Sequence, residues 1–273
     1  MPRTERAIQI RLNKNVEIQA VVGNFVGDRD QLENKILSTL EDGDEGMLLN
    51  PEFDSRPFYL TWIYQNLNEL QKEQFRYALL ALLENLGSKP ERFNNSVADD
   101  LLLIIPDICK PDKKAASIAA KNLKKLIKNR EAIEIPTPVE NKDIAVSLQA
   151  RAIQSLVGLE TKENLSFWEK LANDYSGIYD DMILHGIINL DFDIGIKWII
   201  KHQDSKGVQS AFLGSLAYYF KEKFGEEKTD KAIQELIPQV SAEFAKMLTE
   251  RQKEIKDWLK NEPDYIRIHF QKN

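Results

Sequence analysis

Apolar side chains recur every three or four residues along most of this 273-residue chain, which is the period of amphipathic helices. The densest run lies between Ser166 and Phe224, where three or four such helices follow one another with very short breaks. Helices joined by loops this short pack as neighbours and run roughly antiparallel. Because the apolar stripes are wide and aromatic, we expect each of these helices to contact more than one other helix, as in the middle of a stack.

The same period predicts helices on both sides of this run, over residues 28–40, 57–66, 69–86, 96–105, 111–130, 141–159, 228–236 and 240–260. The first helix of each suspected pair begins about 31 to 45 residues after the previous one, inside the range of helical-hairpin repeats. This arrangement resembles HEAT- and armadillo-like α-superhelices over residues 57–262, on spacing and length alone. It implies an all-α fold of stacked antiparallel helix pairs. A compact, non-repetitive helical bundle is the alternative.

The two ends of the chain show a different pattern, in which apolar and polar residues alternate. Residues 7–12 and 16–22 alternate on either side of a polar turn at 13–15 and predict a β-hairpin. Residues 265–270 alternate in the same way, and a third strand would stabilise a hairpin that is marginal alone. We therefore expect the termini to form a small sheet, with two unpaired tails as the alternative.

The predicted elements divide the chain into four segments. These are an N-terminal β-hairpin segment (1–27), an N-terminal helical part (28–135), a C-terminal helical part continuous with it (139–262) and a C-terminal strand or tail (263–273). The Pro-containing stretch 134–138 separates the two helical parts, and it is the expected position of any domain boundary.

Composition indicates a folded protein with a substantial core. Hydrophobic residues make up 42% of the chain and aromatic residues 9%. The one cysteine, Cys109, excludes an internal disulfide, and its apolar surroundings predict a buried rather than a reactive thiol. No run approaches the roughly 18 apolar residues of a membrane span, and the N-terminus lacks the apolar region of a signal peptide. We therefore expect a cytoplasmic protein without a membrane span.

The chain is acidic overall, with a net charge of −6 and a pI near 5.4, but one segment is strongly basic. Residues 110–130 carry eight lysines and arginines and one acid, Asp112. On a helical wheel four lysines share one face, further lysines flank it, and alanines, leucines and an isoleucine lie opposite. Such a face can bind nucleic-acid phosphates, an anionic membrane surface, an acidic protein or the acidic N-terminal third of this chain; otherwise it is a solvated helix face. The candidate partner-binding residues are Lys114, Lys121, Lys124, Lys125 and Lys128.

Six potential metal ligands lie close together in the sequence: Asp180, Asp181, His185, Asp191, Asp193 and His202. Asp181 and His185 are four residues apart and would share one side of a helix. Asp191 and Asp193, however, stand where a helix N-cap is expected, and Asp180 and Asp181 stand in a first turn, where acids suit the helix dipole. Because helix formation accounts for nearly all of them, we expect no metal site.

No glycine-rich nucleotide-binding motif and no nucleophile-elbow motif occurs, so we assign no catalytic residue and no cofactor. The leading hypothesis, by analogy of architecture, is a non-enzymatic helical scaffold that mediates protein–protein interaction. The first alternative is a nucleic-acid-binding helical-repeat protein, for example a HEAT-like DNA-base glycosylase, that uses the basic helix at 111–130. The second is an unrecognised hydrolase or transferase, because a catalytic site can be assembled from distant residues. The sequence does not identify a small-molecule ligand.

Overall fold

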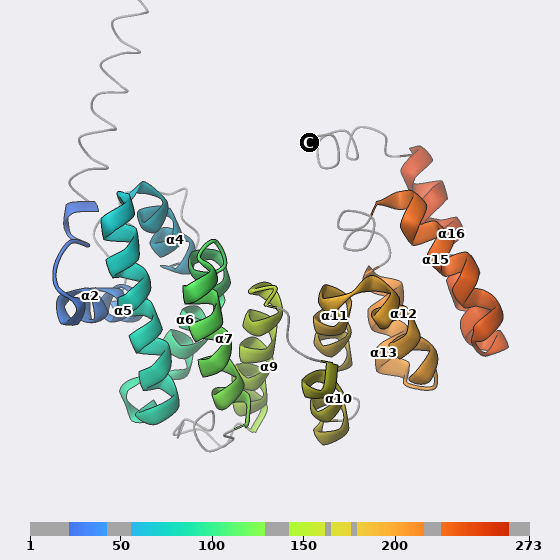
Figure 1. The fold of residues 1–273 in the computed structure, drawn as a ribbon, viewed down its shortest axis with the longest axis horizontal. Helices are drawn as coiled ribbons and strands as arrows, with labels where there is room; N and C mark the ends of the chain where they lie inside the picture. Colours follow the sequence, from blue (N-terminus) through green and yellow to red (C-terminus); the bar gives the residue numbers. More distant parts are fainter. Residues whose placement is uncertain are drawn as a thin grey trace, which may run out of the picture. The chain divides into compact units, whose positions relative to one another are not determined.

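The computed structural model describes residues 22–42, 56–128, 142–161, 165–175, 179–215 and 225–261. In these residues the fold is entirely helical, with twelve α-helices and two short 3-10 helices (Figure 1). The all-α part of the predicted fold class is therefore confirmed for this part of the chain. Of the predicted N-terminal hairpin only Val22 is described, and it is helical. The rest of the hairpin and the strand predicted at 265–270 lie outside the described residues.

The chain divides into two compact units, residues 1–161 and residues 162–273. The division falls after α9 (Lys142–Gly158), which packs against helices that precede the Pro-containing stretch at 134–138. That stretch lies outside the described residues. The first unit therefore includes a helix that the sequence pattern assigns to the C-terminal helical part.

The first unit is built from two rows of helices. Its described elements are α2 (Arg29–Asp42), α4 (Arg56–Asn66), α5 (Glu69–Ser88), η1 (Pro90–Arg92), α6 (Asn95–Cys109), α7 (Lys113–Lys128) and α9 (Lys142–Gly158). α2, α5 and α7 lie side by side in one row, and α4, α6 and α9 lie side by side in the other (Figure 1). Consecutive helices from α4 to α7 alternate between the rows, and α9 contacts both α6 and α7. Packed helix pairs thus account for the whole described part of this unit.

Side-chain caps determine where several of these helices begin. The Asn68 side chain accepts a hydrogen bond from the Gln71 N–H (3.0 Å), and the Gln71 side chain accepts one from the Asn68 N–H (3.0 Å), which is a capping box for α5. The Asn94 side chain caps α6 by accepting a backbone N–H three residues later, at 2.9 Å. α6 therefore begins at Asn95, one residue before the Ser96 start that the sequence predicts.

α5 forms the centre of the first unit. Its residues 78–83 are all buried, on every side of the helix, because α2, α6 and α7 surround it. Phe75, in the same helix, is fully buried, and its ring centroid lies 6.2 Å from that of Phe25 and 5.8 Å from that of Tyr64. The neighbours of α5, including the basic helix α7, are therefore held against a continuous apolar surface.

The second unit is arranged around α11. Its described elements are α10 (Leu165–Asp174), α11 (Asp180–Leu190), α12 (Phe192–Lys201), α13 (Lys206–Ser215), α15 (Glu226–Leu236), η2 (Ile237–Gln239) and α16 (Ala242–Asn261). α11 contacts α10, α12 and α13. Trp168 of α10 lies directly against Gly186 of α11, where a Cβ atom would overlap the indole ring. The close approach of α10 and α11 therefore depends on glycine at position 186.

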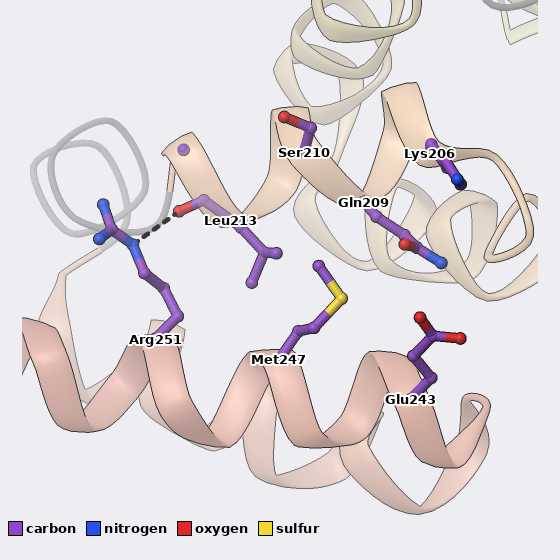
Figure 2. Close-up of a pocket in the computed structure, with 8 residues that line it drawn as sticks. Lys206, Gln209, Ser210, Leu213, Glu243, Met247 and Arg251 are labelled. Atoms are coloured by element: carbon purple, nitrogen blue, oxygen red, sulfur yellow. Dashed lines mark hydrogen bonds between the residues drawn. The ribbon is translucent and has the colours of Figure 1, made fainter.

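A hollow of about 430 Å³ lies between α13 and α16 (Figure 2). Leu213 and Met247 point toward one another across its middle, while Glu243 and Arg251 stand toward its two ends (Figure 2). The Arg251 guanidinium is held in place, because Nε donates to the Leu213 carbonyl at 3.3 Å and Nη1 donates to Glu254 at 2.9 Å. The hollow thus has an apolar middle and charged rims, and it opens to solvent on the surface of the second unit.

Candidate functional site

The basic helix predicted at 111–130 is α7, and its two faces are those that the helical wheel predicts. The buried face consists of Ala115, Ala116, Ala119, Ala120, Leu123, Leu126 and Ile127. This face packs against α5, α6 and α9. The helix carries six lysines and no acid. Lys113, Lys114, Lys121, Lys125 and Lys128 are exposed, and Lys124 is half-buried.

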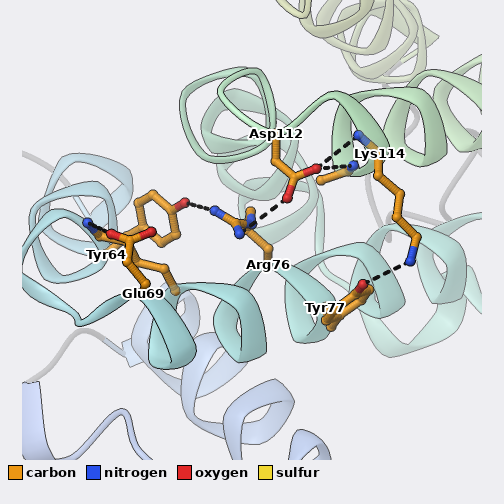
Figure 3. Close-up of polar contacts among 8 residues, drawn as sticks. Tyr64, Glu69, Arg76, Tyr77, Asp112 and Lys114 are labelled. Atoms are coloured by element: carbon orange, nitrogen blue, oxygen red, sulfur yellow. Dashed lines mark hydrogen bonds and ion pairs between the residues drawn. The ribbon is translucent and has the colours of Figure 1, made fainter.

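The N-terminal end of α7 is fastened by an ion pair and a helix cap that share one carboxylate (Figure 3). Asp112 Oδ1 accepts the backbone N–H groups of Lys114 (2.9 Å) and Ala115 (3.0 Å), which is the pattern of an N-cap. Its Oδ2 lies 3.3 Å from Nη2 of Arg76, and Nη1 of Arg76 donates to the Tyr64 hydroxyl at 2.7 Å. One arginine on α5 therefore joins α4 to the start of α7.

Asp112 is stabilised in its charged form by these neighbours. The Ala115 N–H, helped by the Lys114 N–H and by the positive charges of Arg76 and Lys114, holds the pKa of Asp112 below its usual range. The cap therefore remains ionised at neutral pH, and a negative charge at a helix N-terminus also suits the helix dipole. This acid, the one acid that the sequence shows among the basic residues, holds the helix in place rather than weakening its basic face.

The C-terminal end of α7 is fastened by a buried side chain of α9. Nε2 of Gln149, which is 6% exposed, donates to the Ile127 carbonyl at 3.0 Å. The last carbonyls of a helix have no partner within the helix, so this bond satisfies one of them. With both ends bonded to neighbouring helices, α7 presents its lysines from a fixed backbone.

Lys121, Lys125 and Lys128 form no hydrogen bond or ion pair with other residues in the part of the chain that the structure describes. Lys114 differs, because its Nζ lies 3.4 Å from the Tyr77 hydroxyl and 5.9 Å from the centre of that ring. Lys124 is half-buried and has a neighbour of its own. Lys121, Lys125 and Lys128 thus leave three positive charges on one helix face without a compensating carboxylate among the residues that the structure describes.

Tyr77 is a member of this surface that the lysine pattern does not identify. It lies on α5, is 41% exposed and stands beside Lys114 (Figure 3). The sequence does contain a signal for it, because Tyr77 lies off the apolar stripe of α5, where an aromatic side chain would face solvent. Its position next to Lys114 follows only from the packing of α5 on α7.

The potential metal ligands of the second unit take part in helix contacts. Asp191 caps α12, as predicted, by accepting the N–H groups of Asp193 (2.8 Å) and Ile194 (3.1 Å). Asp180 Oδ2 accepts the Ser205 hydroxyl at 2.5 Å. Among the described residues no three carboxylate, histidine or cysteine side chains gather as a metal site requires. These acids therefore have structural partners.

Two other side chains carry groups that could act as nucleophiles, the Cys109 thiol in the core of the first unit and the Ser210 hydroxyl on the surface of the second. Cys109 is fully buried, as the sequence predicts, and burial raises the pKa of its thiol to about 12. In the hollow between α13 and α16, Ser210 points away from Glu243 (Figure 2), and the lining residues include no histidine. An activated nucleophile needs a base within hydrogen-bond reach, so neither group forms a nucleophilic pair.

His202 ends α12 in a partly buried setting that opposes its protonation. Its ring stacks on Trp198 with centroids 4.4 Å apart, and Nε2 is buried without a hydrogen-bond partner among the described residues. Burial, together with the charge of Lys201, lowers the pKa of His202 below its usual value, although Asp180 and Glu169 act in the opposite direction.

We expect the second unit to lose stability as the pH falls below about 6.5, the usual histidine pKa. The unfolded chain binds a proton at position 202 more readily than the folded chain. The contribution of neutral His202 to the free energy of unfolding is therefore fully present above that pH, and it is lost as the pH falls through the lower pKa of the folded state. Urea unfolding between pH 5 and pH 8, followed by hydrogen exchange of residues 162–273, measures this loss. A His202→Gln variant should show a flatter dependence, and an unchanged pH dependence in that variant would contradict the prediction.

Comparisons with protein-family models, with curated proteins and with solved structures find no match for this chain. Of the described helices, none combines the length and the apolar composition that crossing a membrane requires. The lysine face of α7, defined as Lys114, Lys121, Lys125 and Lys128, is the surface with the clearest chemical preference.

Proposed function

We propose that this chain is a non-enzymatic helical scaffold that binds an acidic protein partner through the lysine face of α7. The observation that carries the proposal is the set of three exposed lysines, Lys121, Lys125 and Lys128, that have no carboxylate partner in the described structure. They project from a helix whose ends are bonded to α5 and α9. A partner therefore meets charges on a backbone that needs no ordering, which lowers the cost of association.

The proposed architecture is an open stack of helix pairs of the HEAT-like kind. The alternation of consecutive helices between two rows in the first unit supports it, since stacked helical hairpins generate such rows. In such a stack each row offers one face to solvent, and α7 belongs to the row of α2 and α5. The lysine face would then be one part of a longer interaction surface.

Two features favour an acidic protein over the nucleic-acid alternative. Within the described residues of α7 the charged groups on this face are all lysines, which lack the guanidinium that makes bidentate phosphate or base contacts. The neighbouring helix α5 exposes Glu73 and Glu84, which place negative charge on the helix next to α7. A polyanion wider than a helix would meet these carboxylates as well as the lysines.

The proposal predicts that wild-type protein binds fluorescent poly-L-glutamate at low salt and that a Lys121/Lys125/Lys128→Glu variant binds it roughly tenfold or more weakly. Each exposed ion pair contributes about 0.2–1 kcal/mol, and the new glutamates add repulsion. Fluorescence anisotropy at two salt concentrations measures the change. The matched control is Lys197/Lys253/Lys256→Glu, which reverses three exposed lysines of the second unit and alters the net charge equally.

The outcomes separate the hypotheses. Wild-type protein that fails to bind poly-L-glutamate at low salt, or an equal loss of affinity in the control variant, would overturn the proposal. Tighter binding of a DNA duplex, lost in the α7 variant, would instead support the nucleic-acid alternative. The circular dichroism of all variants should match that of the wild type, because the substituted side chains are exposed.

A further inference from the structure

We infer that the segment bound by the lysine face is an amphipathic acidic helix, which lies along α7 and places its apolar residues on Tyr77 and Leu70 of α5. This inference depends on the proposed function and specifies its partner. Three observations carry it: the register between α5 and α7, the exposed apolar pair at the Lys114 end of the lysine row, and the spacing of the charges.

The register follows from contacts within the first unit. The connections between α5 and α6 and between α6 and α7 are short, so α5 and α7 run in the same direction, side by side (Figure 1). The contact between Tyr77 and Lys114 brings these two residues to the same level (Figure 3). Residues seven apart on a helix share a face, so two outer rows lie next to each other. The rows are Leu70, Tyr77 and Glu84 on α5, and Lys114, Lys121 and Lys128 on α7. They are offset by one heptad, so that Leu70 lies before the start of α7 and Glu84 is level with Lys121.

The apolar residues stand at one end of this double row. Leu70 is 67% exposed and Tyr77 is 41% exposed, whereas most large apolar side chains of the described first unit are buried. A partner that covered both would remove apolar surface from water, which is favourable. A solvated charged face has no such requirement, so the pair indicates a partner with apolar as well as acidic residues.

The charges define the rest of the partner. Lys114 and Lys128 are 14 residues apart, which is about 21 Å along a helix axis. Four turns of a partner helix cover this length, and carboxylates three, four and seven residues apart on it would repeat at the spacing of the lysines. The apolar end on Tyr77 and the acidic run on α7 thus belong to one helical segment.

The test uses synthetic helical peptides of 21 residues with a fluorescent label and the full-length protein. The patterned peptide has two leucines seven apart at one end, then glutamates three, four and seven apart on the same face, with alanine and glutamine elsewhere. A second peptide has the reverse order, so that both directions of binding are tested, and a third has the same composition in shuffled order. We expect the better patterned peptide to bind about tenfold more tightly than the shuffled peptide.

Two variants locate the interaction. A Leu70→Ser/Tyr77→Ser variant should bind the patterned peptide about tenfold more weakly. The single Leu70→Ser variant should bind poly-L-glutamate with unchanged affinity, because Leu70 is not part of the lysine face. The matched control for the double variant is Val26→Ser/Phe58→Ser, which removes two exposed apolar side chains, 49% and 60% exposed, elsewhere in the same unit. The control should bind both probes as the wild type does.

The results separate this inference from the proposed function. One result would exclude the helical partner and leave the acidic-protein scaffold standing. In it, the α7 charge reversal weakens binding of every peptide, whereas the order of residues in the peptide and the Leu70 and Tyr77 substitutions do not change the affinity. If wild-type protein binds neither poly-L-glutamate nor any peptide, both proposals fail. Preferential binding of duplex DNA, or of vesicles containing phosphatidylserine, would overturn the inference in favour of those surfaces.

Discussion

Replacing Phe75 by alanine is expected to lower the free energy of unfolding of the first unit by about 3–5 kcal/mol. The ring is fully buried in α5 and contacts the rings of Phe25 and Tyr64. Its removal leaves a cavity that the surrounding helices cannot fill without moving, and it also removes two aromatic contacts. Arg76, the next residue, bonds Tyr64 to the start of α7, so the same cavity loosens the anchor of the lysine face.

Hydrogen exchange read by mass spectrometry measures this effect by segment. Protection should fall across α2, α5 and α7, and poly-L-glutamate binding should be lost under conditions that unfold this unit. A Leu70→Ala variant on the same helix is the control, because Leu70 is 67% exposed and its truncation should change stability little. If residues 162–273 lost as much protection as the first unit, Phe75 would not belong to a core that is separate from that of the second unit.

Replacing Gly186 by valine is expected to destabilise the second unit by about 1–3 kcal/mol or more. A Cβ at this position overlaps the indole of Trp168, which is itself 2% exposed. Accommodating valine requires a large buried ring to move or α10 and α11 to separate. Alanine is a smaller test of the same clash, because its better helix propensity, worth about 1 kcal/mol over glycine, offsets part of the cost.

Gly214 supplies the matched control for this substitution. It lies in α13, and a Cβ there would meet no atom within 4 Å, so Gly214→Ala should be neutral or slightly stabilising. A Trp168→Leu change in the Gly186→Val background should recover part of the lost stability by making room for the new side chain. Chemical denaturation followed by hydrogen exchange of residues 162–273 reports both effects. If Gly186→Val and Gly214→Ala destabilised the second unit equally, the contact with Trp168 would not be the cause of the loss in Gly186→Val.

The two substitutions together test the division of the chain. If each unit has its own core, Gly186→Val should leave poly-L-glutamate binding unchanged at temperatures where the first unit remains folded. Phe75→Ala should weaken it. Binding that is lost in both variants would show that the second unit contributes to the partner site.

The lysine face could be predicted from the sequence because an amphipathic helix is a local structure. Whether a residue is buried on α7 depends on its angle around one axis, and that angle follows from its position in the sequence. Ala119, Leu123 and Ile127 are fully buried on the predicted side, and Lys121 and Lys125 are exposed on the other. Helix starts were predicted less well, because several residues compete as N-caps, and Asn94 caps α6 two positions before Ser96.

The partners of the face could not be predicted in this way. Tyr77 and Lys114 are 37 residues apart and meet only because α5 and α7 pack side by side. Arg76 joins Tyr64 and Asp112, which lie on different elements, and its hydrogen bond and ion pair depend on their relative positions to within an ångström. No local pattern contains that information.

By itself the sequence determined that the described chain is helical, that Cys109 is buried and that α7 carries one basic face, because periodicity and composition alone govern these properties. The tertiary structure decided which side chains surround that face and which of its charges have no carboxylate partner among the described residues. It also decided that Trp168 packs directly against Gly186. These depend on contacts between helices distant in the chain, and such contacts are selected by the shape and burial of whole surfaces rather than by any single segment.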